Sequence, residues 1–238
     1  MALREQLAEK ADWVAVHEAA PAHAPAPLRL IRTTAVGQQP TRGYRITKRV
    51  TDVTISLFLL VVLLPLLAVV ALAIRLNSPG AAIFRQWRIG LDGQDFRIWK
   101  FRTLTAAEDG DHIAQVTRED PRVTRIGRFL RRTSIDELPQ LINVVRGEMS
   151  LVGPRPHARA HDFYFAERIE NYAFRHSVKP GLTGWAQVNG LRGETATLEE
   201  MSRRVGFDLW YVRQARLVLD MQILFATPRA VFLGRNAW

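Results

Sequence analysis

The sequence predicts an α+β fold that is mainly helical, contains one small β-hairpin and is anchored in a membrane by one bent helix. Residues 53–74 form an uncharged apolar run of the length that a membrane helix needs. Two short segments rich in aromatic and branched residues follow this run, and a glycine turn separates them. In residues 207–232, aromatic and apolar residues occur beside arginines, which suits either amphipathic helices that lie in a lipid interface or ordinary core packing.

Length and charge limit the partners. The chain has 238 residues, of which 47% are hydrophobic, and this is enough for one sizeable domain with its own core. Its formal net charge of +10 indicates an anionic partner, such as nucleic acid, anionic lipid or a phosphorylated substrate. The absence of cysteine excludes disulfides and thiolate metal sites.

The chain divides into three parts. We expect residues 1–46 to form a flexible tail. A short amphipathic pattern there is followed by a linker rich in proline and alanine at 21–27. Residues 47–76 contain the membrane helix. Residues 77–238 form the domain that follows it.

The membrane helix has basic residues on both sides. Arg42 and Arg45 precede it, and Arg75 and Arg85 follow it, whereas a spanning helix usually has its basic flank on the cytoplasmic side alone. Pro65 lies near the middle, removes a backbone hydrogen bond and bends the helix. We therefore expect a re-entrant helix that enters the bilayer and returns to the same side, with a spanning helix as the alternative.

The hairpin is predicted from residues 83–89 and 96–101, with Gly90-Leu91-Asp92-Gly93 as the turn. The returning strand leads into Lys100-Phe101-Arg102-Thr103, whose basic residues suit an anion.

An acidic pair, Asp136 and Glu137, lies between arginines at a predicted helix start. Pro139 lacks a backbone N–H and fits best within the first helical turn, which makes Asp136 the N-cap. Such a helix end also favours an ionised carboxylate and attracts phosphate. A structural cap and a carboxylate that attacks phosphorus are therefore compatible roles for Asp136.

Several motifs occur in a characteristic order along residues 48–238, and together they resemble the bacterial sugar transferases, the monotopic polyprenyl-phosphate phosphoglycosyl transferases. The matching segments are residues 48–52, 65, 78–80, 100–103, 134–141, 149–156 and 179–190. One departure is Leu64, which stands where many members have a serine immediately before the mid-helix proline.

The resemblance implies an enzyme on the cytoplasmic side of the bacterial inner membrane. It would transfer a sugar-1-phosphate from a UDP-sugar to polyprenyl phosphate, usually undecaprenyl phosphate, and release UMP. Asp136 would attack the β-phosphate to form a covalent phosphosugar intermediate, and Glu137 would assist. Mg²⁺ would neutralise the diphosphate with Asp136 as its protein ligand, although which carboxylate binds the metal stays open.

The remaining site residues are basic. Arg131 and Arg155 are candidates for phosphate contacts, because arginine presents a fixed fork of N–H donors, and Lys100 and Arg192 complete the set. The glycine-rich segment 181–193 is either a lid over the nucleotide or a set of structural turns. By analogy with exopolysaccharide-initiating members, the sugar is expected to be glucose or galactose; a homodimer remains open.

Two other function classes were weighed. A nucleic-acid-binding module would explain the charge, but the apolar helix and the lack of a readout motif argue against it. A non-catalytic membrane scaffold for polysaccharide assembly would leave the acidic pair and the 153–156 loop without a role. His157 and His161 have a zinc-like spacing, but no third ligand is apparent, so zinc is not expected.

Overall fold

The computed structural model describes residues 41–105, 116–117, 120–193, 195 and 197–233. Most of the predicted N-terminal tail therefore lies outside the described residues. Helix α2 (Arg42–Asn77) begins before the apolar run and takes in residues 42–46, which the sequence placed in the tail. The Thr41 hydroxyl caps this start by accepting a hydrogen bond from the Tyr44 backbone N–H.

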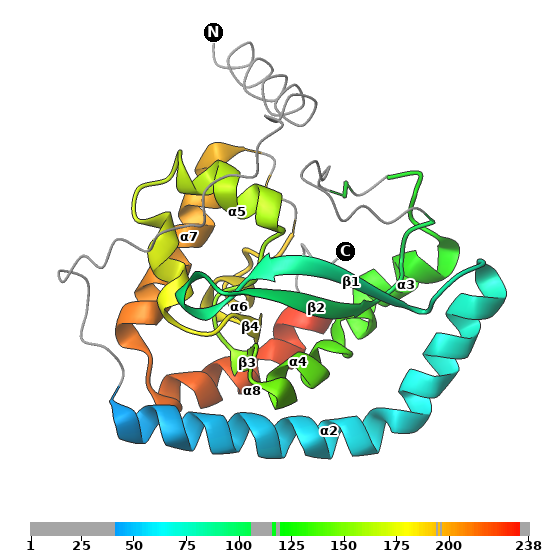
Figure 1. The fold of residues 1–238 in the computed structure, drawn as a ribbon, viewed down its shortest axis with the longest axis horizontal. Coiled ribbons are helices and arrows are strands. Elements are labelled where there is room, and N and C mark those ends of the chain that lie inside the picture. Colours follow the sequence, from blue (N-terminus) through cyan, green and yellow to red (C-terminus); the bar gives the residue numbers. More distant parts are fainter. Residues whose placement is uncertain (1–40, 106–115, 118–119, 194, 196, 234–238) are drawn as a thin grey trace, which may run out of the picture.

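Helix α2 runs along one edge of the domain and bends part way along its length (Figure 1). Pro65 is the proline inside it, and a helix-interior proline is the usual cause of such a bend. The helix is long and apolar enough to cross a membrane. Large apolar side chains cover the face turned away from the domain, at positions 46, 50, 57, 58, 61, 62, 64, 66, 69, 72 and 76. An apolar face of this extent is unfavourable in water and suits lipid.

The predicted hairpin is confirmed. Strands β1 (Ile83–Ile89) and β2 (Asp95–Phe101) pair antiparallel, with Ile83 opposite Phe101. A short 3₁₀ turn, η1 (Leu91–Gly93), joins them, and Asp92 adopts a left-handed φ of 53° there. The strand register directs Phe96 and Ile98 into the main core.

A second, parallel pair of strands was not predicted. β3 (Ser150–Val152) pairs with β4 (Gly181–Thr183), and each has three residues. A Cβ on Gly181 would lie 2.1 Å from the backbone nitrogen of Gly153, so glycine is required for the two backbones to approach.

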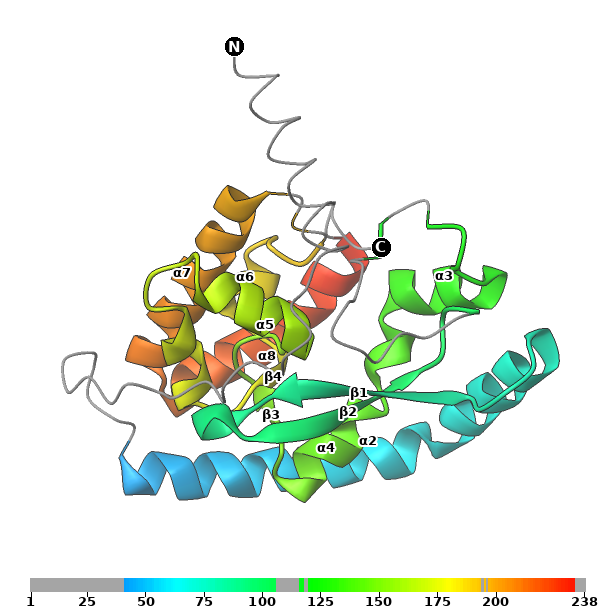
Figure 2. The same cartoon turned by 45° about the horizontal axis from the view of Figure 1, so that its top comes forward.

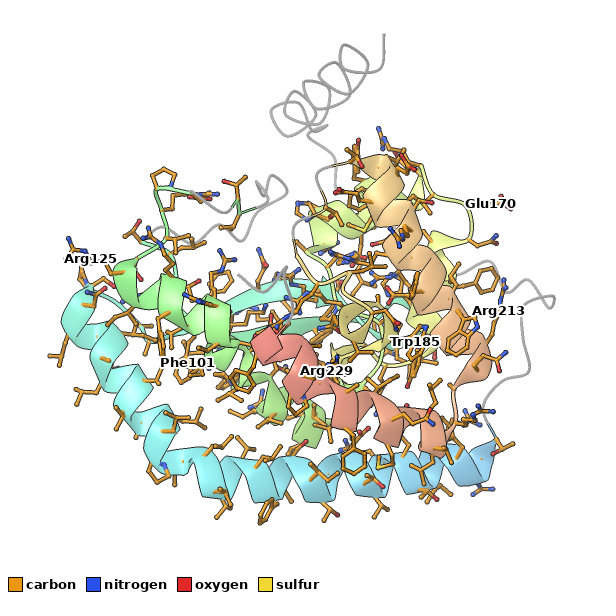
Figure 3. The ribbon with its side chains drawn as sticks, turned by 180° about the vertical axis from the view of Figure 1, so that it is seen from behind. Phe101, Arg125, Glu170, Trp185, Arg213 and Arg229 are labelled. Atoms are coloured by element: carbon orange, nitrogen blue, oxygen red, sulfur yellow. The ribbon has the colours of Figure 1, made fainter. Side chains whose placement is uncertain are left out.

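Besides α3 (Arg125–Thr133) and η2 (Ile135–Glu137), described below, further helical segments of the described residues belong to the domain. They are α4 (Gln140–Arg146), α5 (Arg159–Ala166), the 3₁₀ helix η3 (Tyr172–Ser177), α6 (Trp185–Val188), α7 (Leu198–Gln214) and α8 (Leu217–Leu233). Seen from behind, α8 lies next to α2, and Trp185 of α6 points toward α7 (Figure 3). The Trp185 ring stacks on Trp210 of α7 at 4.9 Å.

Polar bonds attach the first half of α2 to the domain. Asp220 of α8 accepts hydrogen bonds from Tyr44 (2.8 Å), Lys48 (2.9 Å) and Tyr211 (2.6 Å). Asp52 accepts one from the backbone N–H of Leu151 at 3.1 Å. Since these groups are largely buried, their bonds fix the position of α2 relative to β3 and α8.

The prediction that Asp136 caps a helix is wrong. Helix α3 (Arg125–Thr133) ends at Ser134, which has a left-handed φ of 57°. A separate 3₁₀ turn, η2 (Ile135–Glu137), follows, and α4 begins at Gln140 with Pro139 in the N-cap position. The reversal at Ser134 starts this 3₁₀ turn two residues before the helix start that the proline pattern predicts, which places Asp136 inside the turn.

Candidate functional site

A cavity of about 250 Å³ lies between the hairpin, the α3–η2 junction and the start of α7. In Figure 2 the hairpin lies below α3 and α7 and between them in the view. Within the described residues, Asp136 is the one carboxylate that lines it, among eight cationic side chains: Lys100, Arg88, Arg102, Arg122, Arg131, Arg155, Arg192 and Arg204. This charge balance suits a ligand with several negative oxygens.

Glu137 is bound by two of these cations. The Lys100 ammonium donates to its Oε1 at 2.9 Å, and the Arg155 guanidinium donates to Oε1 at 2.6 Å and to Oε2 at 3.1 Å. Burial raises the pKa of Glu137, but Arg155 and Lys100 outweigh this effect and hold the pKa well below its usual range. Glu137 is therefore an ionised carboxylate fixed by a forked ion pair.

Asp136 is electrostatically different from its neighbour. It is 7% exposed and accepts no hydrogen bond from the described residues. Burial and the adjacent Glu137 charge raise the pKa of Asp136 to about 6, while Lys100, Arg131 and Arg155 oppose the rise. At neutral pH the carboxylate is ionised, more basic than an ordinary aspartate, and open to the cavity. These are properties of a nucleophile or a metal ligand.

The structure brings together the residues that the sequence selected for this site. Asp136, Lys100, Arg131, Arg155 and Arg192 all line the cavity, and Glu137 bonds to two of them. Burial lowers the pKa of Arg131, Lys100 and Arg192, and the two carboxylates oppose this effect. Pro65, the predicted membrane bend, lies in α2 and is not part of the cavity.

Arg175 supports the site from behind. It is 2% exposed, and its Nη2 donates to the backbone carbonyl of Arg155 at 2.6 Å and to Asp208 at 2.8 Å. Its Nη1 donates to Asp162 at 3.2 Å, and Tyr172 donates to the same carboxylate at 2.6 Å. Sequence reasoning missed this network, because its members come from α5, η3 and α7 and no local spacing connects them.

Further residues line the cavity, and of these the sequence indicated only Arg102 as suited to an anion. Arg88 and Arg102 lie at strand β1 and just after strand β2, and Arg122 pairs with Asp120 at 2.8 Å. His157 lines the cavity and hydrogen-bonds to Tyr172 at 2.7 Å, and burial holds its pKa well below the usual range, so the ring is neutral. The position of Arg88 on the other strand of the hairpin was the available signal for that residue.

A metal ion at this site would need ligands from a substrate. Among the described residues, no group of three or more His, Asp or Glu side chains is arranged to hold a metal by itself. Mg²⁺ is commonly bound by one or two carboxylates together with substrate phosphates and water. Asp136, with its unbonded carboxylate, fits that pattern.

The 181–193 segment is partly regular, since it contains β4 and α6, and its end brings Arg192 and Gly193 to the cavity wall. The outcome lies between the two alternatives for this segment: it is folded, and it also lines the site.

The chain matches the family model described as bacterial sugar transferase over residues 43–234. A UDP-glucose:undecaprenyl-phosphate glucose-1-phosphate transferase of Escherichia coli K12 is 50% identical over 194 residues, which cover 82% of this chain and 42% of that protein. A protein of the same name from Caulobacter vibrioides is 51% identical, with 85% of this chain and 76% of the relative covered. A UDP-N-acetylgalactosamine-undecaprenyl-phosphate N-acetylgalactosaminephosphotransferase of Aeromonas hydrophila is 39% identical, with 83% and 46% covered.

Coverage of the relatives is uneven. The chain spans about two fifths of the E. coli relative and of a second relative from Klebsiella pneumoniae, but about three quarters of the Caulobacter protein. The family model covers most of the chain, including the hairpin, the acidic pair and every element that lines the cavity. The chain therefore belongs to the bacterial sugar transferase family.

Proposed function

We propose that this protein transfers a hexose-1-phosphate from a UDP-sugar to undecaprenyl phosphate and releases UMP. The observation that carries the proposal is the contrast within the acidic pair. Glu137 is neutralised by Lys100 and Arg155, whereas Asp136 faces the cation-lined cavity with a raised pKa and an unbonded carboxylate. Relatives that are about 50% identical over the aligned residues are named UDP-glucose:undecaprenyl-phosphate glucose-1-phosphate transferase.

In the first half-reaction, the diphosphate lies among the arginines of the cavity. An Asp136 carboxylate oxygen forms a bond to the β-phosphorus. The bond between that phosphorus and the oxygen bridging to the α-phosphate breaks, and UMP leaves with the electron pair. The product is an acyl phosphate on Asp136 that carries the sugar.

In the second half-reaction, a phosphate oxygen of the polyprenyl acceptor attacks the same phosphorus. The bond to Asp136 breaks, and the aspartate carboxylate is restored. The chain's cations hold the oxyanions in both steps. Arg131 and Arg155 line the same cavity as Asp136, and Arg155 is held there by its bond to Glu137.

Glu137 has a supporting role in this scheme. Its negative charge keeps Lys100 and Arg155 in place and also raises the proton affinity of Asp136. A more basic carboxylate is a better nucleophile, so Glu137 acts on the reaction through its neighbour.

Asp136 and the substrate diphosphate would together hold Mg²⁺, with water at the other positions. When bound, the metal would neutralise the diphosphate charge and polarise the phosphoryl oxygens.

The membrane placement is part of the proposal. The bent, lipid-suited helix α2 would enter the cytoplasmic leaflet of the inner membrane and return, which leaves the domain on the cytoplasmic side. The exposed apolar residues of α8, including Phe225 and Phe232, would lie at the same interface.

Labelling of introduced cysteines tests this topology, because the chain has none of its own. Cysteines replacing Arg42 and Arg85 should both react with an impermeant reagent added to the cytoplasmic face. Reaction from opposite faces would show that α2 spans the bilayer.

Glucose is the proposed sugar, since several relatives at about half identity are named for it, whereas the N-acetylgalactosamine relative is 39% identical. A screen of UDP-glucose, UDP-galactose and both N-acetyl sugars should give the highest kcat/KM for UDP-glucose.

The activity test uses the full chain in lipid nanodiscs with undecaprenyl phosphate, Mg²⁺ and UDP-glucose. The expected result is UMP release that depends on the acceptor for continued turnover. Without acceptor, mass spectrometry should find a hexose phosphate on Asp136. A chain that releases no UMP with any of the four donors would fit a scaffold instead.

A further inference from the structure

The cations of the cavity differ in what neutralises them. Lys100 and Arg155 share Glu137, and Arg122 pairs with Asp120. Arg102 donates to the Ser78 and Pro79 carbonyls, with an Nη2–O distance of 2.7 Å for the first. These side chains are held by the protein itself.

The Nε of Arg102 is buried without a hydrogen-bond partner, as is that of Arg204, but Arg204 is more deeply buried than the other cations named above. It lies in the first half of α7, lines the cavity and is 5% exposed. One of its donors reaches the Gly193 carbonyl at 2.5 Å, but its Nε is buried without a hydrogen-bond partner, and no described carboxylate forms an ion pair with it. Burial, together with repulsion from Arg155 and Arg175, lowers the pKa of Arg204 to about 10, although Asp208 opposes this. A buried guanidinium with an unpartnered donor and no ion-paired carboxylate is unfavourable unless an anion completes it.

Arg192 has the same property on the neighbouring segment. Its Nη1 is buried without a hydrogen-bond partner, and no described carboxylate pairs with it. The Gly193 carbonyl, which Arg204 binds, belongs to the next residue in the chain. Arg204 therefore holds the segment that carries Arg192, and both arginines line the cavity.

The position of α7, which carries Arg204, indicates which phosphate these two arginines would bind. The N-terminal end of α7 lies on the side of the domain away from α2 (Figures 1 and 2). A lipid-linked acceptor would approach from the side of α2, whereas a water-soluble nucleotide has no such restriction. The side away from α2 is therefore open to the nucleotide's phosphate.

We propose that Arg204 and Arg192 form an anion seat for the α-phosphate of the uridine nucleotide. The inference rests on the proposed function. When the bond between the β-phosphorus and the bridging oxygen breaks, that oxygen stays with UMP and its phosphate gains negative charge. The two guanidinium groups bind this charge, which lowers the barrier to departure and keeps UMP bound until it dissociates.

The test compares Arg204→Met and Arg192→Met with Arg203→Met in the full chain in nanodiscs. Arg203 is the adjacent arginine on α7 and is exposed, so it is the matched control. Calorimetry measures the Kd of UMP, and steady-state kinetics give KM for the UDP-sugar and for undecaprenyl phosphate.

We expect Arg204→Met and Arg192→Met each to weaken UMP binding by about tenfold or more, as the loss of a hydrogen-bonded charge does. KM for the UDP-sugar should rise with it, KM for undecaprenyl phosphate should stay within about twofold, and Arg203→Met should match the wild type. Uridine, which lacks the phosphate, should bind wild type and Arg204→Met equally well.

Unchanged UMP affinity in both variants overturns the seat. A rise in acceptor KM with unchanged UMP affinity also overturns it and assigns the two arginines to the lipid phosphate. If Arg204→Met does not fold, the Kd of UMP is measured for Arg204→Lys and Arg192→Met instead. Arg204→Lys keeps the positive charge at this buried position. Calorimetry with UMP needs no turnover, so a wild-type chain that binds UMP through Arg204 but transfers no sugar contradicts the proposed function alone.

Discussion

The Nη2 atom of Arg175 donates a 2.6 Å hydrogen bond to the backbone carbonyl of Arg155, the residue whose guanidinium forks onto Glu137. The charge at the acidic pair is thus connected, through one peptide group, to a fully buried arginine behind it. Asp162 and Asp208 neutralise that arginine on either side.

Arg175→Lys should destabilise the protein by about 3 kcal/mol or more, because a lysine keeps the charge but cannot reach Asp162, Asp208 and the Arg155 carbonyl together. Thermal unfolding in lipid nanodiscs measures this as a lower Tm. Arg168→Lys is the control, since Arg168 is half-exposed and makes local contacts. Equal melting temperatures for the two variants would contradict the supporting role of Arg175.

Asp136→Asn should remove turnover and the covalent intermediate while the fold is retained. The raised pKa of Asp136 means that its ionised form costs folding free energy; this group stabilises the fold most at low pH, and the contribution is lost as pH rises through about 6. The variant should therefore unfold at the same or a higher temperature than the wild type at pH 8. Asp92→Asn, in the exposed hairpin turn, should leave activity unchanged. Near-wild-type turnover by Asp136→Asn would show that another group is the nucleophile.

The pH dependence of kcat/KM for the UDP-sugar should report the ionisation of Asp136. Because the nucleophile must be ionised, the rate should fall about tenfold per pH unit below about 6. Glu137, whose pKa is well below its usual range, stays ionised over this interval and adds no second limb. A profile that is flat between pH 5 and pH 8 would count against this assignment.

Glu137→Gln separates the two carboxylates. The change removes the negative charge that raises the pKa of Asp136, so the acid limb of the remaining activity should move to lower pH. It also leaves Lys100 and Arg155 without their carboxylate, which should cost about 3 kcal/mol of stability. The pH profile and urea unfolding measure the two effects. An acid limb that moves to higher pH would mean that Glu137 does not act through Asp136.

Pro65→Leu tests the bend in α2. Leucine restores the missing backbone donor and favours a straight helix, so one flank should cross the bilayer and the cysteine replacing Arg85 should lose its cytoplasmic labelling. Leu64→Ala, at the exposed neighbouring position, should keep both flanks on one side. Unchanged labelling in Pro65→Leu would show that contacts with the domain, rather than the proline, set the geometry.

Local patterns predicted the hairpin and the position of the acidic pair. Gly90-Leu91-Asp92-Gly93 supplies the backbone freedom for a turn, and the flanking strands carry their own β-forming residues. The prediction that Asp136 is an N-cap failed because the left-handed Ser134 sets where the turn begins. Serine gives little sequence signal for that conformation. Strands β3 and β4 are too short for any alternation to show.

The part of the site that the sequence did not predict is formed by residues that are far apart in the chain. Arg204 binds the Gly193 carbonyl 11 residues away, and Arg175 binds Asp208 33 residues away. Each is an ordinary arginine in the sequence, and it is the packing of α7 against η3 and the 190–193 segment that buries it.

The 3.1 Å bond from the Leu151 N–H to Asp52 has a consequence for the height of the site. Asp52 belongs to the helix proposed to lie in the bilayer, and Leu151 stands four residues before Arg155 in the strand that leads to it. Helix α2 and the segment that leads to Arg155 are therefore joined by a direct hydrogen bond. In the proposed membrane placement, this bond and the bonds of α2 to Asp220 would together set how far above the lipid phosphates Asp136 stands, and so how far an acceptor must rise from the bilayer to reach it.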